Sequence, residues 1–104
     1  MSRAPDAATL LERALLAGAR AAGCLMRLAE SESTPWASVT FTGARHRLVL
    51  TGERSPALET WLAGLPEAEV ALRGHLVADL GVVRLVRTDK ELTAVLEVLT
   101  VEAR

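Results

Sequence analysis

The segment Trp36–Gly52, WASVTFTGARHRLVLTG, decides the fold, because apolar and polar residues alternate along it on both sides of a central Gly43-Ala44 pair. Alternation with a period of two is typical of a β-strand with one buried face. Glycine at the first loop position favours a two-residue type II′ turn. The segment therefore predicts a β-hairpin. The predicted inner face of this hairpin consists of Ala37, Val39, Phe41, His46, Leu48 and Leu50.

Helices are expected on both sides of this hairpin. Residues 4–30 are dense in Ala, Leu, Arg and Glu, and their apolar side chains recur every three to four positions. The polar run Glu30–Pro35 is then expected to be a linker that ends this first helix. After the hairpin, Ser55 and Pro56 supply an N-cap and a first-turn proline, which predicts a short second helix up to about residue 64.

The C-terminal third is expected to form strands. Residues 76–87 and 92–101 are rich in Val and Leu and flank the polar turn 88–91, so we expect a second hairpin with Arg87 opposite Leu92. A single strand over residues 69–87 would be about 60 Å long at roughly 3.3 Å per residue, which is too long for this domain. We therefore expect a short strand at 69–73 and a corner at Gly74.

This order of elements, α-β-β-α-β-β-β, predicts an α+β fold. The most economical arrangement is a two-layer sandwich, in which an antiparallel sheet of four or five strands carries both helices on one face. The chain has 104 residues, half of them apolar, which suits one domain with a substantial core. No second domain is expected within residues 1–104.

The composition excludes several classes of protein. The net charge is −1, whereas nucleic-acid-binding domains usually carry a basic excess, so nucleic acid is not an expected partner. Arginine outnumbers lysine eleven to one, as in proteins encoded by GC-rich bacterial DNA. The single Cys24 cannot form an internal disulfide and fits a reducing compartment, so we expect a cytoplasmic protein. No motif predicts a metal ion or a cofactor, and no apolar run is long enough to span a membrane.

Two places hold side chains with possible chemistry. His75 and Asp79, beside the expected corner at Gly74, form a candidate acid–base pair, since histidine titrates near neutral pH and a carboxylate would orient it. The alternative is a structural histidine that binds backbone groups. Arg45, His46 and Arg47 form a candidate anion site on the first hairpin; the alternative is that both arginines are ordinary solvated residues.

The outer face of the expected sheet carries more apolar residues than a solvated face needs. Such a patch usually marks an interface, and a symmetric homodimer is the commonest way to cover it. The expected interface residues are Val82, Val86, Val95, Leu99 and Val101. The sequence thus favours a non-enzymatic, homodimeric binding or accessory module. The alternative is a small ligand-binding protein or acid–base enzyme, with a pocket between helices and sheet near His46 or near His75 and Asp79.

Overall fold

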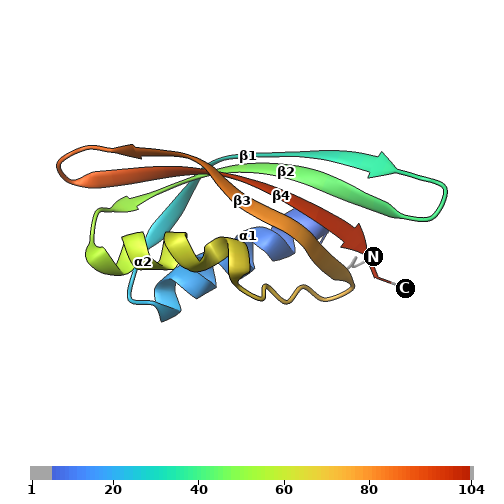
Figure 1. Ribbon diagram of the computed structural model, residues 1–104, viewed down its shortest axis with the longest axis horizontal. Coiled ribbons are helices and arrows are strands. Elements are labelled where there is room, and N and C mark those ends of the chain that lie inside the picture. The colour runs from blue at the N-terminus through green and yellow to red at the C-terminus, as the bar shows by residue number, and fades with distance from the viewer. Residues whose placement is uncertain (1–5, 104) are drawn as a thin grey trace, which may run out of the picture.

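The computed structural model describes residues 6–103, which form two helices, one 3-10 turn and four strands (Figure 1). In chain order these elements are α1 (Ala7–Ala21), β1 (Met26–Ala37), β2 (Thr42–Glu53), α2 (Pro56–Gly64), the 3-10 turn η1 (Leu65–Glu67), β3 (His75–Arg87) and β4 (Glu91–Glu102). No helix within residues 6–103 is long and apolar enough to cross a membrane.

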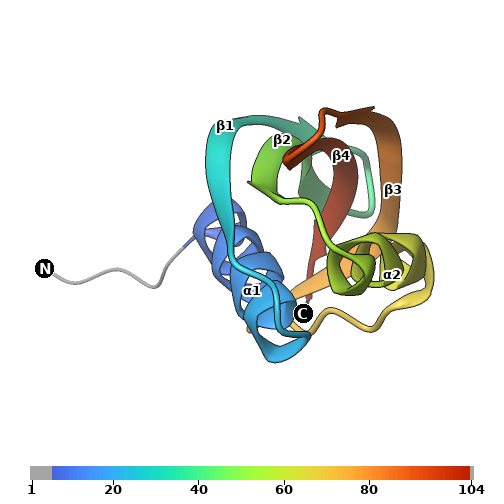
Figure 2. The ribbon, with the colours of Figure 1, turned by 90° about the vertical axis from the view of Figure 1, so that its left-hand side faces the viewer.

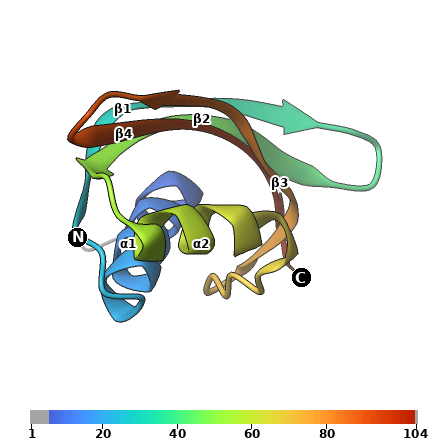
Figure 3. The same cartoon turned by 60° about the vertical axis from the view of Figure 1, so that its left-hand side comes forward.

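The strands form one antiparallel sheet in the order β1-β2-β4-β3. Both helices lie side by side on the same, concave face of this sheet (Figures 2 and 3). The predicted two-layer α+β architecture is therefore confirmed. The sheet has four strands, because residues 69–73 form no strand and contribute only an isolated bridge between Leu72 and His75.

The first helix is shorter than predicted. It ends at Ala21 and is followed by Gly23, whose φ of 87° is a conformation that favours glycine. The amides of Gly23 and Cys24 donate to the carbonyls of Arg20 and Ala19, which closes the helix in a Schellman motif. The expected linker at 30–35 is instead part of the edge strand β1, where Pro35 is tolerated. Residues 4 and 5 of the predicted helix lie outside the described residues.

The first hairpin exists, but its predicted turn is wrong. The chain reverses at residues 38–41, where the Ser38 amide donates to the Phe41 carbonyl at 2.7 Å and Ala37 pairs with Thr42. Val39 and Phe41, predicted to be buried, are therefore exposed at the tip. Gly43 lies within β2 and not in the turn. Glycine is needed there because a Cβ would meet the Thr100 carbonyl oxygen of β4 at 2.0 Å.

The second hairpin has the predicted pairing of Arg87 with Leu92. Two β-bulges, between Val77 and Asp79 and between Val82 and Arg84, then shift the register of β3. Each bulge adds one residue and so reverses which side chains face inward. Val82, predicted on the outer face, packs against the core, whereas Val83, predicted inside, is exposed.

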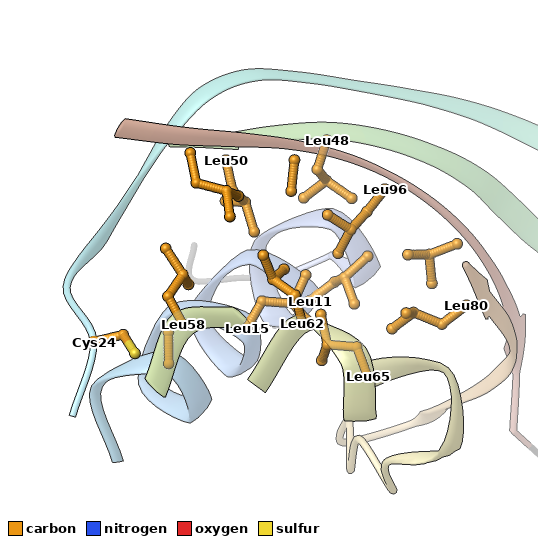
Figure 4. Packing of buried hydrophobic residues seen from close by; sticks show 14 of the residues in the cluster. Leu11, Leu15, Cys24, Leu48, Leu50, Leu58, Leu62, Leu65, Leu80 and Leu96 are labelled. Atoms are coloured by element: carbon orange, nitrogen blue, oxygen red, sulfur yellow. The ribbon is translucent and has the colours of Figure 1, made fainter. Parts of the chain in front are cut away.

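The core is built almost entirely of leucine (Figure 4). Leu11 and Leu15 of α1 and Leu58 and Leu62 of α2 meet the inner face of the central strands. The α2 N-cap is the predicted one, with the Ser55 hydroxyl accepting from the Leu58 amide at 3.1 Å. An ion pair from Arg87 to Glu59 joins the end of β3 to α2.

The strands are longer than the helices that cover them. A strand of 12 residues is about 40 Å long, whereas the 15 residues of α1 reach only about 22 Å. The β1–β2 hairpin therefore projects beyond the helices (Figures 1 and 3), and the molecule is 46 Å along its longest axis. The inner face is left without a helical cover at this projecting end.

Leu48→Ala is expected to lower the free energy of unfolding by about 2–5 kcal/mol, because Leu48 is fully buried between sheet and helices. Val39→Ala, which also truncates an aliphatic side chain of the same hairpin, is expected to change it by less than about 0.5 kcal/mol, since Val39 is at the exposed tip. Chemical denaturation measures both values. Similar losses in the two variants would contradict the observed turn at 38–41.

Candidate functional site

A pocket lies on the inner face of the sheet beyond the start of α1. Its volume is about 600 Å³, and we call it the end pocket. All four strands and the N-terminus of α1 contribute to its wall. The lining residues are Asp6, Ala7, Pro35, Trp36, Ala37, Thr42, Gly43, Ala44, His75, Thr100 and Glu102. The pocket exists because the strands extend beyond the helices that cover the rest of this face.

A chain of hydrogen bonds through His46 lies directly behind this pocket. The His46 ring is 3% exposed and lies between two hydroxyl groups: Ser33 Oγ is 2.7 Å from Nδ1, and Thr100 Oγ1 is 2.8 Å from Nε2. The Thr100 hydroxyl in turn donates to the Ala44 carbonyl at 3.4 Å. Since this hydroxyl has one proton, its oxygen accepts from His46, which places the histidine proton on Nε2. The Nδ1 atom then accepts from Ser33.

His46 is held in its neutral form by this environment. Burial disfavours the charged imidazolium and lowers the pKa of His46 below its ordinary value, although the carboxylates of Asp6 and Glu12 act in the opposite direction. Both ring nitrogens are occupied by protein hydroxyls, so the ring satisfies its own hydrogen-bonding needs inside the chain. Its role at the pocket is to fix the position of Thr100, which lines the wall.

Two carboxylates stand at the pocket rim. Asp6 caps α1 by accepting from the Thr9 amide at 2.9 Å, and this hydrogen bond lowers the pKa of Asp6. Glu102, at the end of β4, accepts from the Thr42 hydroxyl. His75 is the other titratable group among the described lining residues. The described part of the wall therefore holds two carboxylates and no arginine or lysine.

Trp36 supplies the aromatic part of the wall. Its Nε1 atom lies 3.0 Å from the point that a Cβ of Gly43 would occupy. The indole therefore fits in this position because residue 43 has no side chain. The same Nε1 is buried and has no hydrogen-bond acceptor. A buried donor without a partner costs about 1–3 kcal/mol, so this indole is placed by packing at the expense of a hydrogen bond.

The structure separates the predicted acid–base pair. His75 lines the end pocket on the inner face, whereas Asp79 borders a groove on the outer face. The cause is the bulge between Val77 and Asp79, which reverses the alternation along β3. His75 and Asp79 therefore do not form one site.

The predicted basic cluster lies along one groove of about 330 Å³, which Arg45, His46 and Arg47 all line. The His46 side chain is nevertheless only 3% exposed. Three acidic residues, Glu32, Asp79 and Glu97, share this groove. They offset the positive charge that would hold an anion, so the geometry does not support the predicted anion site.

A larger cavity, of about 810 Å³, lies at the opposite end of the sheet beside Leu25 and the β3–β4 turn. Both of its arginines have partners: Arg27 pairs with Glu91 at 3.6 Å, and Arg54 bonds to Glu59 and the Thr88 carbonyl. The end pocket differs because a buried polar chain supports it and because none of its described lining residues is arginine or lysine.

Within residues 6–103, no group of three or more His, Cys, Asp or Glu side chains is arranged to hold a metal ion. Sequence reasoning missed Ser33, Trp36 and Thr100 as members of a site. The alternation of Ser31 and Ser33, which face inward, can be recognised only when residues 26–37 are identified as a strand. The helix-forming composition before it concealed that strand.

Comparisons with protein-family models, with curated proteins and with solved structures found no match to this chain.

The stability of the fold is expected to depend on His46 at mildly acidic pH. An unfolded histidine takes up a proton as the pH falls through about 6.5, and His46 in the folded chain resists this because its pKa is lowered by burial. Its contribution is therefore fully present above that pH, is lost progressively as the pH falls towards the folded pKa, and then levels off.

Denaturation at pH 7.5 and at pH 5 measures this loss. The variant His46→Gln should remove the histidine-dependent part of the difference, and the matched variant His75→Gln should keep it. An NMR titration that gives His46 a pKa at or above that of an unfolded histidine would contradict the buried neutral ring.

Proposed function

We propose that the protein binds a small polar molecule in the end pocket and does not transform it. The observation that carries the proposal is the convergence of polar side chains from five elements on one cavity of about 600 Å³. Ligand sites are typically cavities of a few hundred Å³ with a small number of placed polar groups. Between the helices and the middle of the sheet lies the leucine core.

The polar wall supports binding because its parts are held in advance. Thr100 is fixed by His46 and Ala44, and Trp36 is fixed against Gly43. Preorganised groups lose little entropy when a ligand arrives.

Binding fits the geometry better than catalysis. The sequence contains two histidines. His46 is buried with both nitrogens bonded inside the chain, so it has no free nitrogen for a substrate. His75 lacks the carboxylate partner predicted for it, since Asp79 lies on the other face. A general base needs to be within hydrogen-bond reach of the proton that it removes.

Filling the pocket tests this function. Ala44→Leu adds bulk to the pocket wall, and Ala57→Leu adds the same bulk to the exposed side of α2 as a control. NMR spectra of the labelled protein with a fragment panel of cations, anions and neutral molecules should show shifts that cluster on the lining residues. Ala44→Leu should abolish them and Ala57→Leu should keep them. Shifts confined to other surfaces, or none from the whole panel, would contradict the function.

A homodimer through the outer face is a second candidate function, as expected for an accessory module of the cytoplasm. The helices cover only the inner face (Figure 3), and Val86 on the outer face is 43% exposed. Leu99 and Val101 are half-buried. Val95 differs from the other expected interface residues, because its neighbours in the same chain already reduce its exposure to 7%. A second copy of the sheet would cover the remaining apolar area.

Light scattering at tens of micromolar is expected to give the mass of a dimer. Val86→Glu together with Leu99→Glu should lower this mass to that of a monomer, because both substitutions place charges in the apolar face. Val39→Glu, at the exposed hairpin tip, serves as the control and should leave the dimer intact. A monomeric wild-type chain at this concentration would contradict the dimer.

A further inference from the structure

The charge of the end pocket indicates what kind of molecule it accepts. Among its described lining residues, Asp6 and Glu102 are acidic, His75 is the remaining titratable residue, and none is arginine or lysine. Elsewhere on the surface, Arg27, Arg54 and Arg87 pair with glutamates. Within the part of the chain that the structure describes, no arginine or lysine lines the pocket beside its two carboxylates.

We propose that the ligand of the end pocket is a small organic cation, such as a primary amine, held between the two carboxylates and the ring of Trp36. This inference rests on the proposed binding function. An ammonium group is attracted to carboxylates and to the face of an indole. The apolar part of the ligand lies along Pro35, Ala37 and Ala44, which form the apolar part of the pocket wall.

The N-terminus of α1 does not reverse this preference. A helix N-terminus carries a partial positive charge that favours anions. Here Asp6 already occupies that position as the N-cap, with its carboxylate bonded to the Thr9 amide. The full negative charge of Asp6 exceeds the partial charge of the helix end, so the field in the pocket is still one that attracts cations.

Three probes of the same shape and different charge separate the possibilities: n-butylammonium, n-butanol and n-butyrate. The chain has two tryptophans, of which Trp36 lines the pocket and Trp61 packs on Gly18 at 3.5 Å in the helical layer. NMR follows the indole N–H signal of each, with Trp61→Phe used to assign them. We expect n-butylammonium to shift the Trp36 signal with saturation and to leave the Trp61 signal in place.

Conservative variants test the carboxylates without damaging the fold. Asp6→Asn keeps an N-cap, because asparagine caps helices as well as aspartate does, and Glu102→Gln keeps an acceptor for Thr42. Each should weaken n-butylammonium binding by about threefold to fivefold, as expected for a partly exposed ion pair. Glu97→Gln removes a carboxylate from the opposite face of the sheet and should leave the affinity unchanged.

The outcomes separate this inference from the function beneath it. If n-butanol or n-butyrate binds the pocket as tightly as n-butylammonium, the pocket is a ligand site but the proposal that its ligand is a cation is wrong. If Asp6→Asn and Glu102→Gln bind n-butylammonium as tightly as Glu97→Gln does, the two carboxylates do not select a cation and the proposal is likewise wrong. If none of the three probes moves the Trp36 signal at concentrations up to tens of millimolar, both the cation and the pocket as a site for small ligands are overturned.

Discussion

The difference in length between strands and helices shapes this protein. Helix residues advance about 1.5 Å each and strand residues about 3.3 Å, so a 15-residue helix covers little more than half of a 12-residue strand. The leucines of α1 and α2 can therefore cover only part of the inner face. Where they end, the same face must be compatible with water or with another molecule, and its side chains change from leucine to threonine, histidine and serine.

His46 marks this change along β2. Leu48 and Leu50, which follow it in β2, face the leucine core, and His46 faces inward two residues closer to the hairpin tip. A buried imidazole is tolerated because Ser33 and Thr100 on the two neighbouring strands bond both of its nitrogens. These hydrogen bonds fix β1, β2 and β4 relative to one another at the point where the helices no longer cover the sheet. They thereby hold the wall of the end pocket in place without any contact from the helices.

Local signals predicted the parts of the fold that depend on neighbouring residues. The α2 cap at Ser55 and Pro56 and the pairing of Arg87 with Leu92 follow from short-range chemistry, and the structure has both. The errors arose where tertiary contacts decide. The helix-forming composition of residues 4–30 led to a helix prediction that included the start of β1, and Gly23, with its positive φ, is the residue at which the helix stops. The turn of the first hairpin was misplaced because Gly43 is needed for close contact with Thr100 and Trp36 rather than for a turn.

The candidate site was predictable only in part. His46 and His75 were both singled out from the sequence, and both lie at the end pocket, one behind its wall and one in it. The bulge in β3 separates His75 from Asp79, its expected partner, and acidic residues share the groove that Arg45, His46 and Arg47 line. Bulges leave little trace in one sequence, since they depend on how two strands curve together. The pairing of β1, β2 and β4 is what identifies Trp36, Ser33 and Thr100 as members of one site.

A crystal structure of the protein grown with n-butylammonium tests the central claim most directly, namely that the uncovered end of the sheet is a site for a small cation. The account predicts an open end pocket with the ammonium nitrogen between the carboxylates of Asp6 and Glu102 and the alkyl chain against Trp36. It also predicts His46 bonded to Ser33 and Thr100 behind the wall. A pocket closed by collapse of the β1–β2 hairpin onto α1, or an open pocket that holds only water, would contradict it.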